Sequence, residues 1–215
     1  KRLVAYSSVN HMGFVVLGIA SMTTIGTQGA ILQMLNHGIS TGALFLMVGM
    51  LYDRAHTRMI ADFGGIASRM PIFTTFFMIV TLSSIGLPLT NGFVGEFLIL
   101  NGTFVSGFAW GKSFAVIATL GILLGAVYML WMVKRAFWGP ENPDPERGTA
   151  HLHHDLNARE IATLVPLVVL IFWMGLHPQT FLTASEAPVR GLLADIQAPA
   201  PRMAPEAGPA PLEVR

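Results

Sequence analysis

Three ionisable side chains, Glu96, His37 and His11, stand within long stretches of sequence that hold no other Asp, Glu, Lys or Arg. A carboxyl group can take up and release a proton, and an imidazole can accept a proton on one ring nitrogen while it releases another from the second. A charge at mid-membrane is costly, so ionisable residues inside membrane spans usually face a polar interior and mark proton or ion paths. The three side chains are therefore candidates for proton transfer if the surrounding sequence crosses a membrane.

Glu96 comes shortly after residues 86–92, a run that contains one proline and two glycines. Proline lacks a backbone donor and glycine loosens the chain, so this run cannot continue one regular helix. Backbone groups freed at such a break can hold water and polar side chains inside a membrane. Gly92 and Gly95 share a helix face with Glu96, which predicts that a neighbouring helix approaches closely there. The alternative is a purely structural Glu96 that bonds the backbone at the break.

Both histidines belong to polar stripes on otherwise apolar segments. The two stripes are Gln33, His37, Ser40 and Thr41, and Ser7, Asn10 and His11. Residues at these spacings lie on one face of a helix. His37 is near the centre of its segment and is the stronger candidate for a proton relay, whereas His11 lies nearer the membrane edge. The alternative for each is a buried histidine that bridges two helices.

The composition favours a membrane protein over a soluble domain. Apolar residues make up 53% of the 215 residues, and charged residues only 12%. Apart from Glu96, no charged residue falls within residues 3–52, 70–111, 113–133 or 161–185. A bilayer core of ~30 Å is crossed by about 20 mostly apolar helical residues, so each window is long enough for at least one crossing. The chain is predicted to be an all-α polytopic membrane protein.

Residue types that are missing narrow the chemistry. The chain has no cysteine, which excludes disulfides, thiolate catalysis, Fe–S clusters and Cys-ligated zinc within it. A net charge of +1 predicts no binding of nucleic acid. The group His151, His153, His154 and Asp155 lies in a polar loop and is interpreted as solvated rather than as a metal site. We therefore expect neither a cofactor nor a metal in this chain.

About five transmembrane helices are predicted within one helical region, residues 1–185. Their ranges are about 3–21, 28–51, 70–105, 113–133 and 161–176. The third is expected to be broken near Pro88 into half-helices over 71–85 and 93–105. Asn157 and Glu160 are spaced as a capping pair for the last helix.

The remaining segments are polar. A loop over 134–160 precedes the last helix, and residues 186–215 form an Ala/Pro-rich tail that is expected to be largely disordered, with a helix weakly indicated over 189–196. If residues 70–105 cross the membrane once, most basic residues lie on one side of it. Basic residues favour the cytoplasmic or matrix side, so the loop is predicted to face that side and the tail the opposite side. Because the chain begins at Lys1 rather than at Met, we expect it to be a piece of a longer protein.

Several motifs resemble one family in order and spacing over residues 1–185. They are KRLVAYSS with His11-Met12-Gly13, then QMLNHG around His37, then LPLTNGFVGEF around Glu96, and DLNARE at the entry to the last helix. Together they resemble the antiporter-like membrane subunits of respiratory complex I. The acidic Glu96 is similar to the M-type (chain 4) subunits, whereas the sister L-type subunits carry Lys at the matching place.

The resemblance implies a parent of fourteen transmembrane helices in two inverted five-helix repeats, of which this chain would hold helices ten to fourteen. Glu96 would be the acidic proton site on the broken helix, His37 a relay histidine and His11 a weaker connecting group. The implied activity is proton translocation coupled to NADH:quinone oxidoreduction, with NADH, FMN, Fe–S clusters and quinone in other subunits. The implied partners are the other membrane-arm subunits, including the sister antiporter-like subunits, and the lipid bilayer.

Two other functions remain open on the sequence alone. A subunit of a multi-subunit cation/proton antiporter shares this ancestry and has similar broken helices. A passive membrane scaffold is the second alternative, although it would not need Glu96 or the polar stripe around His37. For the location, the bacterial inner membrane is preferred over the mitochondrial inner membrane.

Overall fold

The computed structural model describes residues 1–141 and 148–198, which fold as helices joined by short connections. The long helices are α1 (Arg2–Ala20), α2 (Thr24–Ala55), α4 (Pro71–Ser84), α5 (Asn91–Phe104), α6 (Gly111–Phe137), α7 (Ala158–Leu176) and α8 (Gln179–Gln197). Three short helical turns lie in the connections: η1 (Ile60–Asp62), α3 (Ile66–Arg69) and η2 (Gly148–His151). The predicted all-α fold is confirmed.

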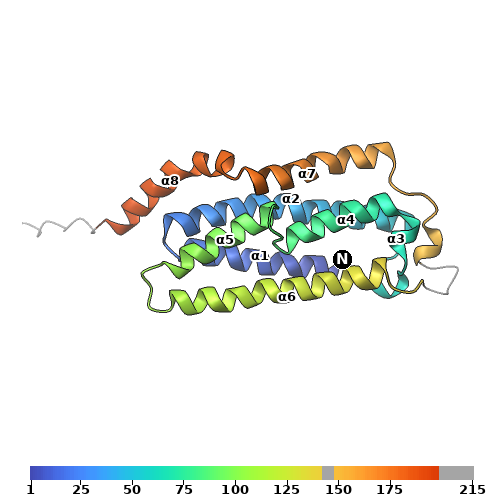
Figure 1. Ribbon diagram of the computed structural model, residues 1–215, viewed down its shortest axis with the longest axis horizontal. Helices are drawn as coiled ribbons and strands as arrows, with labels where there is room; N and C mark the ends of the chain where they lie inside the picture. Colours follow the sequence, from blue (N-terminus) through green and yellow to red (C-terminus); the bar gives the residue numbers. More distant parts are fainter. Residues whose placement is uncertain (142–147, 199–215) are drawn as a thin grey trace, which may run out of the picture.

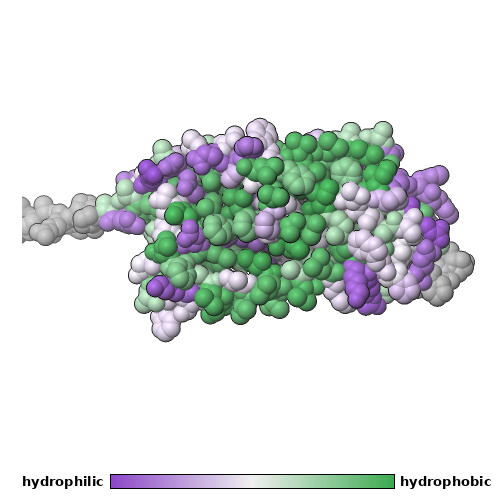
Figure 2. Space-filling view, viewed as in Figure 1, coloured by the Kyte–Doolittle hydropathy of each residue, from purple (hydrophilic) through white to green (hydrophobic). Residues whose placement is uncertain are grey.

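The long helices run lengthwise through the molecule; α4 meets α5, and α7 meets α8, partway along it, whereas the connections between the other long helices lie at its two ends (Figure 1). Four of them, α1, α2, α6 and α7, are long and apolar enough to cross a membrane, and α4 is a shorter apolar helix. Figure 2 shows apolar residues over the middle of the visible face and polar residues toward its ends. An apolar belt between polar ends suits a bilayer, and the chain is a membrane protein.

The third predicted span is a single crossing that is broken in its middle. In Figure 1, α5 continues in the direction of α4, and α6 then returns along the bundle. Residues 85–90 leave the helix between them, and Gly86 and Leu89 both have a φ of 76°. Each half-helix has 14 residues, so the break lies halfway along the crossing. Glu96 therefore stands in the second turn of α5, close to the middle of the bundle.

Close packing of α2 against α5 brings polar residues of both helices together. A Cβ atom at Gly95 would lie 2.3 Å from Oε1 of Gln33 and 2.8 Å from Nδ2 of Asn36, so these two side chains of α2 would have to shift. The absence of a side chain at Gly95 thus lets the two helices approach. The prediction that small residues beside Glu96 admit a neighbouring helix is confirmed.

Aromatic rings hold α4 against α6 at the other half of the molecule. The ring of Phe137 lies 4.7 Å from that of Phe77 and 6.0 Å from that of Phe73, measured between centroids. At the adjacent end, Arg69 pairs with Glu141, with 3.0 Å between Nη2 and Oε2. The guanidinium of Arg69 lowers the pKa of the exposed Glu141 carboxyl below its usual value.

The expected tail begins with a helix. Residues 186–197 belong to α8, so the expectation of disorder is wrong for them, and the helix indicated over 189–196 is longer than predicted. Val189 and Leu193 are one turn apart and both buried, because apolar residues at helical spacing find a surface to pack on. Gln28 of α2 also donates a hydrogen bond to the carbonyl of Leu182 (3.2 Å). Residues 199–215 lie outside the described part of the chain.

The loop before α7 has one residue that is not simply solvated. The carboxylate of Asp155 accepts hydrogen bonds from the backbone N–H groups of Ile72 (2.7 Å) and Phe73 (3.0 Å) at the start of α4. The interpretation of the loop as solvated is wrong for Asp155, since a distant helix start with unpaired N–H groups binds it. The predicted capping pair of Asn157 and Glu160 is confirmed as a capping box.

Candidate functional site

The three predicted site residues come from three different helices. His11 lies on α1, His37 on α2 and Glu96 on α5. His11 and Glu96 are buried, with 5% and 4% of their surfaces exposed, and His37 is partly buried. The fold thus places all three inside the bundle or at its margin, where ionisable groups face polar neighbours rather than lipid.

His11 and His37 contact each other directly. Their Nδ1 atoms are 3.3 Å apart, and the rings meet edge to face at an interplanar angle of 75°. The outer nitrogen of His11, Nε2, lies 2.9 Å from the carbonyl oxygen of Ser84. On His37, Nε2 lies 2.9 Å from Oγ of Ser8, and Nδ1 also lies 3.0 Å from Oγ1 of Thr41.

The partners of the neutral rings determine the tautomer of His11 but not that of His37. A carbonyl oxygen only accepts, so Nε2 of His11 donates to Ser84 and Nδ1 of His11 is the acceptor. His37 can carry its hydrogen on Nδ1, which faces His11 and Thr41, or on Nε2, which faces Ser8, because both hydroxyls can donate or accept. In the first of these tautomers, hydrogen bonds run from Ser8 through His37 and His11 to the backbone of α4. An imidazole pair of this kind can pass a proton from one ring to the other.

A second polar group joins α2 to the break. Ser40 Oγ lies 2.8 Å from Ser83 Oγ, and Ser83 donates to Oδ1 of Asn91 (2.5 Å). Asn36 Nδ2 donates to the carbonyl of Asn91 (2.8 Å) and to Oε1 of Gln33 (3.2 Å). Gln33 and Ser40 of the stripe predicted around His37 therefore face the broken crossing, whereas His37 itself contacts α1.

Glu96 lies against the break itself. A Cβ atom at Gly86 would come within 2.5 Å of Oε2 of Glu96, so the carboxyl group sits directly over this glycine. Within the described part of the chain, no hydrogen bond joins Glu96 to His11 or His37. The structure thus brings the two histidines into contact, and places the carboxyl group separately on the same broken segment.

A small cavity lies between the histidines and the break. It is lined by His11, Gln33, Asn36, His37, Ser40, Ser83, Ser84 and Gly92. Its volume of about 10 Å³ is near the least that one water molecule needs. Ser84 Oγ, Asn36 Oδ1 and Asn91 Nδ2 are buried at or beside it and have no hydrogen-bond partner in the part of the chain that the structure describes. These atoms could hydrogen-bond a water or hydronium ion between His11 and α2.

Sequence reasoning missed several members of this site. Ser8 and Ser84 bond the two histidines, and Asn91 connects the break to α2. Ser84 takes part through its backbone carbonyl, and a backbone role cannot be predicted from the residue type. Asn91 is a polar residue inside the predicted break, so its role could have been predicted from its position. Among the residues that the structure describes, no group of three or more His, Cys, Asp or Glu is placed to hold a metal ion.

The chain is similar to known membrane subunits of respiratory and antiporter complexes. A family model described as "NADH:quinone oxidoreductase/Mrp antiporter, TM" matches residues 1–131. NADH-quinone oxidoreductase subunit M of Rickettsia prowazekii is 49% identical over 195 residues, 90% of this chain and 38% of that protein. NADH-ubiquinone oxidoreductase chain 4 of Marchantia polymorpha is 43% identical over 193 residues, 90% of this chain and 37% of that protein.

A solved structure agrees with these relatives. Respiratory complex I from Thermus thermophilus with bound NADH contains a chain with a TM-score of 0.79 and 28% identity, covering 91% of this chain and 39% of that one. The chain therefore spans less than half the length of the relatives that it matches. The family model covers more than half of the chain. The chain belongs to the NADH:quinone oxidoreductase/Mrp antiporter family of transmembrane subunits.

Proposed function

We propose that this chain is the C-terminal portion of an M subunit (chain 4) in the membrane arm of a proton-pumping NADH:quinone oxidoreductase. In this proposal it forms part of a proton translocation channel, with Glu96, His37 and His11 as the groups that hold and pass protons. The names of its relatives support the enzyme complex. The redox reaction, with NADH, FMN, Fe–S clusters and quinone, would take place in other subunits.

The observation that carries the proposal is the chain of contacts from Ser8 through His37 and His11 to the broken segment. The Nδ1 atoms of the two histidines are 3.3 Å apart, which is within reach for a proton to transfer between them. His11 bonds the C-terminal end of α4, and Glu96 lies against Gly86 two residues beyond that end. A scaffold has no need of buried ionisable groups at the middle of a crossing, where they are costly.

The remaining polar atoms supply the step from His11 toward the break. Its ring lines the small cavity, where Ser84 Oγ and Asn36 Oδ1 have no partner among the described residues. Both ring nitrogens of His11 already have partners, so His11 would pass a proton to a water held by these atoms only after the bond of its Nε2 to Ser84 breaks. Glu96 would hold the proton on the α5 side of the same break.

The partners and the location follow from the same proposal. The chain would contact other membrane-arm subunits, including the sister antiporter-like subunits, and the lipid bilayer. We place it in the inner membrane of a bacterium, since the more similar of its two named relatives is a Rickettsia protein. A multi-subunit cation/proton antiporter remains the competing assembly, because the family model includes both kinds of complex.

The decisive experiment replaces Glu96 by Gln in the full-length subunit within the intact complex. Gln preserves the size of the side chain but cannot ionise, so NADH-driven proton pumping into vesicles should fall at least about tenfold while assembly stays normal. Gln33→Ala is the control, because Gln33 is buried on the neighbouring helix α2 but does not ionise near neutral pH. An assembled Glu96→Gln complex that pumps at the wild-type rate would refute the proton role and leave the scaffold. Pumping without NADH oxidation, in exchange for Na⁺, would favour the antiporter.

A further inference from the structure

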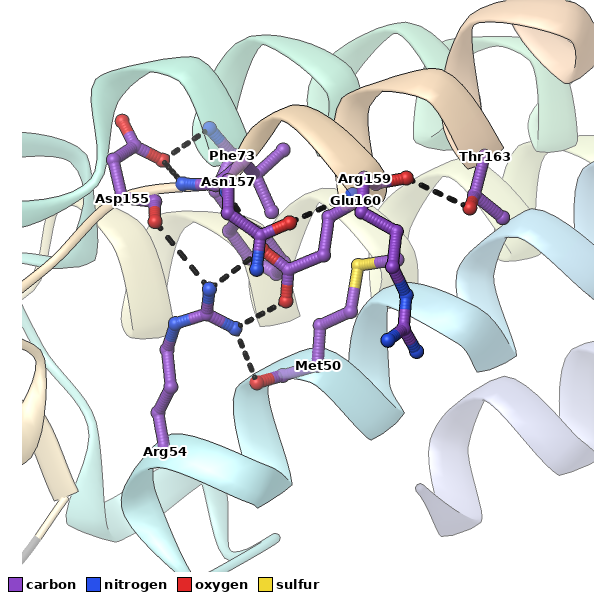
Figure 3. A network of polar contacts seen from close by, with 9 residues as sticks. Met50, Arg54, Phe73, Asp155, Asn157, Arg159, Glu160 and Thr163 are labelled. Carbon is purple, nitrogen blue, oxygen red and sulfur yellow. Dashed lines mark hydrogen bonds and ion pairs between the residues drawn. The ribbon is translucent and has the colours of Figure 1, made fainter.

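Asp155 connects the loop before α7 to the first half of the broken crossing (Figure 3). Its two carboxylate oxygens accept hydrogen bonds from the N–H groups of Ile72 (2.7 Å) and Phe73 (3.0 Å). One of them also accepts from the N–H group of Leu156 (2.7 Å). A carboxylate thus occupies the N-terminal end of α4, although it stands more than eighty residues away in the sequence.

The start of α4 has no cap of its own. Its N-cap residue, Met70, makes no side-chain hydrogen bond, and Pro71 at the first position has no N–H group. Ile72 and Phe73 are the next positions, whose N–H groups lack a partner inside the helix. The positive end of the helix dipole also favours a negative charge there. Asp155 therefore satisfies donors that would otherwise have no partner.

Asp155 is itself held by a charged network. Arg54, in the last turn of α2, donates to both carboxylate oxygens of Glu160, at 2.8 Å to Oε1 and 2.6 Å to Oε2. The same guanidinium donates to the backbone carbonyl of Asp155 (3.3 Å) and to that of Met50 (3.0 Å). This bidentate ion pair is geometrically specific. The side chains of Arg54 and Glu160 are mostly shielded from solvent, with 18% and 17% of their surfaces exposed.

Glu160 also closes the capping box of α7. Its Oε2 accepts from the N–H of Asn157 (2.8 Å), and Oδ1 of Asn157 accepts from the N–H of Glu160 (2.9 Å). The start of α7, the end of α2 and the start of α4 are therefore joined through residues 155–160. Because α2 carries His37 and α4 ends at the break, this network can set how far α4 is displaced along α2.

The opposite end of α4 enters the proton site directly. Ser84 accepts from His11 there, and Ser83 bonds Ser40 of α2 and Asn91 of α5. A helix of 14 residues is about 20 Å long and stiff along its axis, so a shift at its start is transmitted to its end. Hydrogen bonds to the N–H groups of Ile72 and Phe73 point along that axis. They hold α4 against axial sliding.

We infer that Asp155 is a positioning residue for proton translocation: it fixes the axial position of α4, and thereby the contact of Ser84 with His11 and the place of Gly86 against Glu96. This inference rests on the proposed function for its effect on pumping. Its effect on α4 itself does not depend on that function. Asp155 takes no part in the transfer of protons.

The test compares Asp155→Asn, Asp155→Glu and the control Asp195→Asn in the full-length subunit of the intact complex. Asn loses the charge and one acceptor, so hydrogen exchange at the start of α4 should become about tenfold faster, and pumping should slow about tenfold with normal assembly. Glu keeps the carboxylate and should recover more than half of both. Asp195 is exposed on α8, so its neutralisation should change neither.

Each outcome decides the matter. Unchanged exchange at residues 72–75 in Asp155→Asn would overturn the inference, because Asp155 would not then hold α4. Faster exchange with wild-type pumping would also overturn it, provided that Glu96→Gln does abolish pumping. If Glu96→Gln pumps normally, the proposed function fails, while exchange still shows whether Asp155 holds the helix. If the Asp155→Asn complex does not assemble, the Asp155→Glu complex distinguishes the two roles. Wild-type hydrogen exchange and pumping by Asp155→Glu would support the positioning role. Loss of assembly in Asp155→Glu as well would mean that Asp155 serves only the fold.

Discussion

His11 and His37, from adjacent helices, bring their Nδ1 atoms to within 3.3 Å of each other. Nε2 of the neutral His11 ring donates to the carbonyl oxygen of Ser84, so Nδ1 of His11 is the acceptor that faces His37. When His37 carries its hydrogen on Nδ1, that nitrogen can donate to His11 or to the hydroxyl of Thr41. The pair therefore connects α2 to the break through two rings that can take up and release protons.

His37 is expected to matter more than its polar neighbours. His37→Ala removes the ring that contacts both Ser8 and His11, so proton pumping by the intact complex should slow at least about tenfold. Gln33→Ala removes a hydrogen bond of the same stripe but no proton carrier, and should have a smaller effect. Pumping rates in reconstituted vesicles measure both. Normal pumping by His37→Ala would mean that this histidine only bridges α1 and α2.

Substitutions of Glu96 should rank by their ability to ionise. Glu96→Asp keeps the acid with a shorter reach and should retain part of the pumping, whereas Glu96→Gln should retain almost none. Glu96→Ala should pump no better than Gln and should also lower the amount of assembled complex, since removal of this buried side chain leaves a cavity against the break. If Glu96 has only a structural role, Glu96→Gln should pump at a near-normal rate. Pumping normalised to assembled complex separates the two orders.

Gly86 should tolerate no side chain. Its φ of 76° strains any residue with a Cβ by about 1 to 2 kcal/mol, and that Cβ would lie 2.5 Å from Oε2 of Glu96. Gly86→Ala should therefore displace the carboxyl group and reduce pumping to less than half. Gly49→Ala on α2 is the control, since a Cβ there meets nothing within 4 Å. Equal pumping by both variants would show that the position of Glu96 does not depend on Gly86.

The two ends of the bundle should face opposite sides of the membrane. These 215 residues include no cysteine, so a Cys introduced at His153 or at Ala187 is the only one among them, and both positions are exposed. A membrane-impermeant thiol reagent should label the position-153 Cys from the cytoplasmic side and the position-187 Cys from the other, in accordance with the distribution of basic residues. Labelling of both from one side would contradict this topology.

The sequence alone was enough for the overall plan of the protein. Long uncharged windows predicted the crossings, because burying charge in lipid is costly. Pro88 between two glycines predicted the break, because proline cannot continue the hydrogen-bond ladder of a helix. Glu96, His37 and His11 are recognisable as candidate proton-transfer residues because an ionisable side chain inside such a window is equally costly. These are local properties, and each can be recognised from residues that are neighbours in the chain.

Only the tertiary structure decided which of these residues meet. The contact of His11 with His37 depends on the rotation and displacement of α1 against α2, and that of Asp155 with α4 joins residues more than eighty positions apart. The roles of the Ser84 carbonyl and of the N–H groups of Ile72 and Phe73 belong to the backbone, which is the same for nearly every residue type. Over residues 186–197 the sequence indicates a helix only weakly, because the few apolar residues there fold as a helix only where other helices bury them.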